Sequence, residues 1–201
     1  MKKYLILLII LISLIIPSQA FALINAEIYG GYSFEGEAEI EDTDSASVSG
    51  LGYGARIHFY SNIAIIGYGV GGFAQKSPLE GEIKIDSDKE DFDFNRTNYG
   101  LDGFINLTIP MIPIHPYVRG GISIYETIET EYEVNGSTET ETDKSYFQSY
   151  YGGFGLSLKV LPLPVLSVEI FAEYLYEYSI LQESEGEFKG HRVNIGALAR
   201  I

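Results

Sequence analysis

The sequence predicts an all-β protein, an eight-stranded antiparallel up-and-down transmembrane β-barrel. The first observation is residues 165–180, in which apolar or aromatic residues alternate with a second set that includes three glutamates. Alternation of this length is typical of a strand that crosses a bilayer, and the glutamates need water or partners inside a barrel. Two further observations agree, because the alternation recurs along the chain and its connections are alternately short and long.

The first residues have the pattern of a leader. Met1-Lys2-Lys3 is basic, residues 4–16 are almost purely apolar, and small residues follow up to Ala20. This order predicts a signal peptide over residues 1–20 that is cleaved, and a barrel domain over residues 21–201. A transmembrane anchor is the alternative, but the apolar run is short for one.

Eight segments of the remaining chain have an apolar face opposite a face of glycine, serine and charged residues. They are residues 26–40, 48–60, 63–85, 92–109, 117–131, 145–160, 165–180 and 191–201. The first, third, fifth and seventh are followed by long acidic connections. The others are followed by short turns, and two of these turns hold five of the seven prolines, where no ladder N–H is needed. This predicts long extracellular loops and short periplasmic turns.

Composition narrows the function classes. The formal net charge of −15 becomes more acidic when Lys2 and Lys3 leave with the leader, which argues against a nucleic-acid partner. The absence of cysteine excludes a disulfide scaffold and cysteine-bound metals. A mean hydropathy of +0.07 is too low for a helical membrane protein and typical of a barrel, in which every second strand residue meets lipid.

Charged side chains on the polar parity predict a salt-bridge network inside a narrow, filled barrel. The basic members are Arg56, Arg119, Lys159, Arg192 and Arg200, and the acidic members are Glu27, Asp102, Glu169, Glu173 and Glu177. Equal distance from the periplasmic rim predicts two pairs, Glu173 with Arg192 and Glu27 with Arg200. An ion path through the barrel is the alternative function of these residues.

Histidine is the candidate catalytic residue for a lipid-modifying enzyme. His58 is expected near a periplasmic turn, His115 within a turn and His191 near the outer rim. His191 would need a hydroxyl and a carboxylate, and Ser184 and Glu187 are near in sequence. We expect a solvated rim histidine instead, and the sequence predicts no catalytic residue, no metal site and no cofactor.

The acidic segments carry the strongest external signal, with six carboxylates between Glu35 and Asp44 and seven between Glu126 and Asp143. Solvation is one explanation, and divalent-cation bridges to lipid headgroups or docking of a basic partner is another. Aromatic girdles at the membrane interfaces are expected to hold most of a group of tyrosines. These are Tyr60, Tyr99, Tyr117, Tyr146, Tyr150, Tyr176 and Tyr178.

Three stretches resemble the small outer-membrane barrels of the OmpA-like, opacity-protein and OmpX type. They are AEIYGGY at 26–32, PYVRGGI at 116–122 and NIGALARI at 194–201. The last is similar to an assembly signal, with Asn194, Gly196, Ala199 and Ile201 in the signal positions, although most such signals end in phenylalanine. The resemblance implies insertion by the barrel-assembly machinery and contact with outer-membrane lipids and lipopolysaccharide.

Together these features predict a non-enzymatic barrel of the bacterial outer membrane, exported by its signal peptide. Its expected role is structural, or adhesive through acidic loops that contact a basic surface or host partner. A narrow porin, a lipid A-modifying enzyme and a soluble lipocalin-type barrel stay open as alternatives. The last of these would reverse the two faces, because alternation alone does not separate inside from outside.

Overall fold

The computed structural model describes residues 23–39, 46–85, 88–109, 111–134, 137–162, 166–180 and 187–201. The predicted signal peptide lies outside the described residues. Among the residues described, no helix combines the length and the apolar character needed to cross a membrane.

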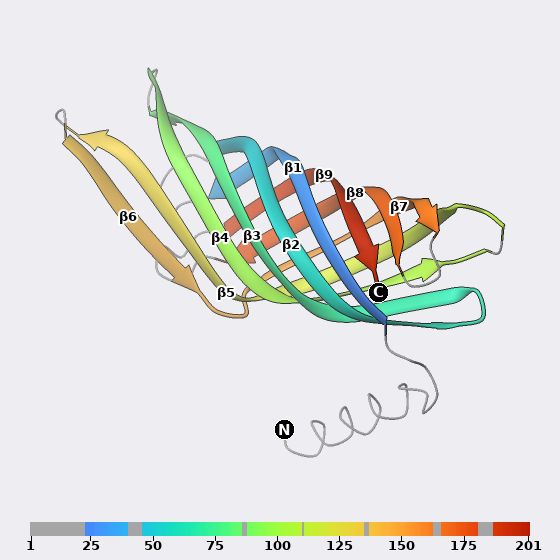
Figure 1. Ribbon diagram of the computed structural model, residues 1–201. Helices are drawn as coiled ribbons and strands as arrows, with labels where there is room; N and C mark the ends of the chain where they lie inside the picture. The colour runs from blue at the N-terminus through green and yellow to red at the C-terminus, as the bar shows by residue number, and fades with distance from the viewer. Residues whose placement is uncertain are drawn as a thin grey trace, which may run out of the picture.

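Nine strands form one antiparallel sheet that closes on itself (Figure 1). They are β1 (Leu23–Glu39), β2 (Ala46–Ile63), β3 (Ile66–Ile85), β4 (Asp88–Leu107), β5 (Ile114–Val134), β6 (Ser137–Ser145), β7 (Ser149–Pro162), β8 (Ser167–Ile180) and β9 (Glu187–Arg200). Strands that follow one another in the chain are paired, except β6 and β7, which both pair with β5. The pairing of β9 with β1 closes the sheet. Because β6 and β7 together occupy one place in the wall, the predicted eight-stranded up-and-down barrel is confirmed.

Several predicted strands are a few residues longer in the structure, as at β9, which begins at Glu187 instead of His191. The largest difference lies between β5 and β6. The segment 131–143, expected to be an acidic loop, is largely strand, because β5 and β6 form a long hairpin in which Val134 faces Ser137. The predicted strand over residues 145–160 begins only at Ser149, and residues 146–148 interrupt the wall. Threonine alternates with acidic residues along β6, so this strand has no apolar face to reveal it in the sequence.

Most of the barrel wall is apolar outside and polar inside. On β8, Ile170 and Tyr176 are exposed on the outer face, whereas Glu173 and Glu177 on the opposite parity are buried in the lumen. The same division holds on β2, where Ile57 points outward and is 61% exposed. Exposed apolar side chains around a polar interior are the arrangement of a transmembrane barrel, and the reversed arrangement of a lipocalin-type barrel is excluded for this section.

The polarity reverses toward the rim that carries the β5–β6 hairpin. There the interior is an apolar cluster composed of Ala46, Val48, Leu79, Phe94, Ile128 and Phe188, each no more than 3% exposed. The outward neighbours of these residues in sequence are polar and exposed, and they include Ser47, Glu80, Asp93 and Glu129. Apolar residues inside and polar residues outside are the arrangement of a protein surrounded by water, so this section has the surface of a soluble protein.

Inward glycines make room for large lumen side chains. A Cβ atom on Gly69 would collide with the ring of Phe104, its ladder partner on β4. A Cβ atom on Gly67 would collide with Tyr60 in the same way. The glycines on alternate positions of β3 therefore set the width available to aromatic rings in the lumen.

Candidate functional site: the barrel lumen

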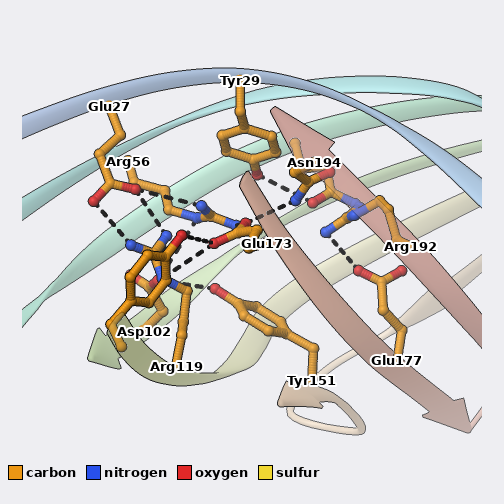
Figure 2. A network of polar contacts seen from close by, with 12 residues as sticks. Glu27, Tyr29, Arg56, Asp102, Arg119, Tyr151, Glu173, Glu177, Arg192 and Asn194 are labelled. Atoms are coloured by element: carbon orange, nitrogen blue, oxygen red, sulfur yellow. Dashed lines mark hydrogen bonds and ion pairs between the residues drawn. The ribbon is translucent and has the colours of Figure 1, made fainter. Parts of the chain in front are cut away.

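The middle of the lumen is filled by an ionic network drawn from five strands (Figure 2). Arg56 Nη2 on β2 donates to Glu173 Oε1 on β8 at 2.7 Å. Arg119 on β5 donates two hydrogen bonds of 2.8 Å to the carboxylate of Glu27 on β1. Asp102 on β4 lies on the same network, 3.7 Å from Arg56 Nε. Because these side chains are almost fully buried, each charge depends on its partners across the lumen.

Neutral groups add further hydrogen bonds to this middle layer. Tyr117 donates to Glu173 at 3.0 Å, and Asn194 donates to its other oxygen at 2.8 Å. Tyr151 donates to Asp102 at 2.9 Å. The guanidinium of Arg56 also stacks 4.0 Å from the centre of the Tyr29 ring. These partners offset part of the cost of removing the charged groups from water.

A second layer lies between the middle layer and the apolar cluster. Arg96 contacts Glu126 and donates to Glu177 at 2.7 Å, and Arg192 lies 2.6 Å from the other oxygen of Glu177. Glu126 is also the shared acceptor of three serine hydroxyls, from Ser145, Ser149 and Ser179. This layer ties β4, β5, β7, β8 and β9 together immediately below the point where β6 leaves the wall.

A third layer lies toward the short turns. Glu169 accepts from Ser157 at 2.6 Å and lies 3.2 Å from Arg200 and 3.4 Å from His115. A cavity of about 20 Å³ adjoins this layer and the middle one, with Arg119 and Arg200 in its wall. This volume has room for about one water molecule, so the cavity is not a channel.

Both predicted ion pairs are wrong in their partners, although all four residues lie in the lumen. Glu173 pairs with Arg56, whereas Arg192 pairs with Glu177. The β8–β9 ladder places Glu173 opposite Asn194, and Arg192 comes two residues before Asn194 on β9.

Glu27 likewise pairs with Arg119 and Arg56, while Arg200 contacts Glu169 and Asn25. The ladder places Glu27 opposite Leu198. Distance from the rim, counted in residues, therefore does not predict contact in a barrel whose strands are tilted and staggered.

The three histidines are placed differently from one another. His115, expected within a turn, lies on β5 and is buried in the lumen. His58 on β2 is also buried in the lumen, with its Nε2 2.6 Å from Asp102 Oδ1. His191 lies on the outer face, where its ring stacks against Phe34 and against Tyr174, and these two rings also contact each other. Its Nδ1 is 2.5 Å from the Tyr174 hydroxyl. Glu187 binds Lys189 instead, and Ser184 lies outside the described residues.

Two tyrosines expected in the aromatic girdle point inward. Tyr60 and Tyr117 are buried in the lumen, where Tyr60 stacks against Arg200. Tyr99, Tyr146, Tyr150 and Tyr176 are exposed on the outer face, as a girdle requires. Tyr60 and Tyr117 share the parity of lumen residues, so their orientation was readable from the alternation.

Arg96 and Glu126 belong to the lumen network although neither was among the charged residues predicted for it. Arg96 has the parity of Asn98 and Asp102 within the predicted strand 92–109, so the alternation already indicated that it points into the lumen. Glu126 has no such signal, because a register shift next to Ile124 reverses the parity of β5. Lys159, expected inside, is only half-buried, and a second shift follows it on β7.

The predicted assembly-signal residues all lie on or next to β9. Asn194 is buried in the lumen, and a Cβ atom on Gly196 would collide with the Phe171 ring. Ile201 is exposed on the outer side and exchanges two backbone hydrogen bonds of 2.9 Å with Ile24. These positions join the end of the chain to β1, but their role in assembly stays a prediction.

Outside the lumen, charged groups meet at the start of β9. Lys189 Nζ lies 2.8 Å from Glu187 Oε2, and both side chains are more than a third exposed. Hydrogen bonds from Lys189 and from Tyr178 hold the pKa of Glu187 below its ordinary value. Within the part of the chain that is described, no group of three or more potential ligands is arranged to hold a metal ion.

The geometry can be compared with that of solved proteins. OprG from Pseudomonas aeruginosa, an outer-membrane protein, matches with a TM-score of 0.53 and 12% identity over 90% of this chain and 96% of its own. The fold is that of the outer-membrane β-barrels. The outer-membrane protease OmpT from Escherichia coli matches with a TM-score of 0.51 and 8% identity over 92% of this chain and 98% of its own.

The attachment invasion locus protein Ail of Yersinia pestis, solved in complex with a heparin analogue, aligns with 17% identity and a TM-score of 0.49. The alignment covers 90% of this chain and all of that one. No protein-family model matches the sequence, and no curated protein matches it significantly. The expected resemblance to small outer-membrane barrels is thus confirmed at the level of the fold.

Proposed function

We propose that this chain is a non-conducting, non-enzymatic barrel of the bacterial outer membrane that holds a folded acidic section above the lipid. The reversal of polarity along the barrel axis carries this proposal. Below the reversal the outer face is apolar and the lumen ionic, whereas above it the interior is apolar and the surface acidic. Export by the leader, insertion through the β9 signal residues and contact with lipopolysaccharide belong to the same proposal.

The acidic section supports a role in contact with basic surfaces. Five exposed carboxylates stand on its outer face, at Glu35, Glu37, Glu80, Asp93 and Glu129. Glu80 and Asp93 are direct ladder partners, and like charges in such a pair are destabilising. A folded support under these charges fixes their spacing, which favours a cationic partner over simple solvation.

Adherence of expressing cells to a polylysine-coated surface tests this role. Neutralising the five carboxylates to glutamine or asparagine is expected to abolish the adherence that the protein confers. The matched control exchanges each Glu for Asp and Asp93 for Glu, which keeps every charge and is expected to keep adherence. Equal adherence of the neutralised and unaltered proteins would remove the proposed contact role.

Separate measurements test the two alternative functions, a narrow porin and a lipid A-modifying enzyme. The buried arginines Arg56, Arg96, Arg119, Arg192 and Arg200 face six buried carboxylates in the lumen, so the network fills the barrel instead of lining a pore. We expect no single-channel conductance in planar bilayers, and steady channels would support the porin alternative. We also expect an unchanged lipid A mass spectrum on expression, and a new species lost with His191→Ala would support the enzyme.

A further inference from the structure

The barrel wall is interrupted between β6 and β7 by two large aromatic residues. Phe147 has a φ of 58°, in the left-handed region that bulky residues rarely adopt. Tyr146 and Phe147 are 54% and 62% exposed. Backbone strain at an exposed aromatic residue is held by its surroundings and often marks a functional contact.

The interruption is the point where the sheet divides. β7 pairs with β5 and β8, whereas β6 pairs with β5 alone among the described strands. In Figure 1 the β5–β6 hairpin extends away from the rest of the barrel at this end. The lumen side of the division is closed by polar groups, since the Ser149 and Ser179 hydroxyls lie 2.7 Å apart above Glu126.

On the outer side, the same level is an aromatic row. Tyr99 faces Tyr125 in the β4–β5 ladder, and the Tyr125 and Tyr146 rings are 5.3 Å apart. Beyond the interruption, the Tyr150 and Tyr178 rings are 5.0 Å apart. Tyr146 and Phe147 therefore supply aromatic side chains to the girdle at the one place in the row where β6 has left the wall.

The exposed residues below and above this aromatic row indicate its depth relative to the membrane. Below it the outer face is apolar, with Phe154 and Leu156 exposed on β7. Above it the exposed residues of β6 are polar and include Thr140, Thr142 and Lys144. Aromatic side chains at such a boundary are stable at the level of lipid headgroups.

We propose that Tyr146 and Phe147 form a lipid-contact site that inserts into the headgroup region of the outer leaflet. This contact pins the end of β6 to the membrane surface and so sets the direction in which β6 leaves the wall, while β5 stays paired with β4 up to Glu131. The inference rests on the proposed place of the chain in an outer membrane.

The chain contains no tryptophan, so Phe147→Trp creates a single fluorescent reporter. We would refold it into phosphatidylcholine vesicles and verify folding by a heat-dependent gel shift. Lipids brominated near the headgroup end of the acyl chain are expected to quench most of its emission, with a blue-shifted spectrum. Thr142→Trp on β6 is expected to show neither effect, and Tyr150→Trp in the girdle is expected to show both.

These variants test the lipid contact of Phe147 separately from the membrane location of the barrel. If Tyr150→Trp is quenched but Phe147→Trp behaves like Thr142→Trp, the lipid contact is overturned while the membrane barrel stands. If Tyr150→Trp is not quenched either, the proposed membrane location fails.

A second variant tests the pinning of β6. Phe147→Asn removes the ring but tolerates the left-handed backbone. A spin label at residue 140 is expected to become more mobile in vesicles with this change and to stay the same in detergent micelles. Unchanged mobility in vesicles would show that the contact does not hold β6.

Discussion

Arg56 on β2 and Glu173 on β8 meet across the lumen, with Nη2 and Oε1 2.7 Å apart and both side chains completely buried. Their strands are not neighbours in the sheet, so the contact spans the barrel rather than a ladder. Glu173 also accepts hydrogen bonds from Tyr117 and Asn194. One carboxylate thus connects β2, β5, β8 and β9, and the cross-section of the barrel depends on it.

Breaking this pair is expected to destabilise the barrel strongly. Glu173→Gln removes the negative charge that Arg56 faces and leaves the buried guanidinium without this partner. Removing one partner of a buried ion pair lowers the free energy of unfolding by about 3–5 kcal/mol. A double-mutant cycle with Arg56→Met is expected to show a coupling of about 1–3 kcal/mol, measured by urea unfolding in vesicles. The cycle of Glu173 with Arg192, which do not pair, is the control, and stronger coupling there would contradict the observed pairing.

Gly69 is expected to tolerate no side chain. Gly69→Ala forces a methyl group against the Phe104 ring and is expected to cost about 1–3 kcal/mol, seen as a lower urea midpoint. Gly72→Ala is the matched control, because its Cβ atom meets only the Gly100 carbonyl oxygen at 3.4 Å. Adding Phe104→Leu to Gly69→Ala is expected to restore part of the loss. A normal midpoint for Gly69→Ala alone would show that the ring can move aside.

The apolar cluster is expected to hold together the barrel section that it fills, where the Phe188 ring also lies 4.8 Å from the guanidinium of Arg96 in the adjoining ionic layer. Phe188→Ala removes a ring that stacks on Phe94, and truncation of a buried phenylalanine costs about 3–5 kcal/mol. We expect added protease to cleave this section faster while the membrane-embedded fragment stays intact. Phe59→Ala, which loses an exposed ring from the lipid face, is the control. Equal cleavage of both variants would mean that the cluster adds no local stability.

The contact between Glu187 and Lys189 predicts a dependence on pH. The pKa of Glu187 lies below its ordinary value of 4.5, because Lys189 and Tyr178 donate hydrogen bonds to its charged form. The stabilisation is therefore complete above pH 4.5 and is lost as the pH falls through the lowered pKa. Lys189→Met is expected to raise the pKa of Glu187 toward 4.5, followed by carbon NMR of its carboxyl group. Lys144→Met on β6 should leave it unchanged.

The sequence by itself determined the strand alternation, the number of strands in the wall and the alternation of short and long connections. These features are local, since each depends on which of two faces a residue occupies and on where turn residues fall. They were enough to place Arg56, Arg119, Glu27 and Glu173 in one lumen.

Only the tertiary structure decided which of these charges meet. Contacts such as that between Arg56 and Glu173 depend on tilt and stagger around the closed barrel, and register shifts near Ile124 and Lys159 alter the parity further. The reversal of polarity at Val48 and Phe188 was likewise hidden, because alternation is the same for either face. Closure of the sheet gives each parity an inside or an outside, and closure is a property of the whole chain.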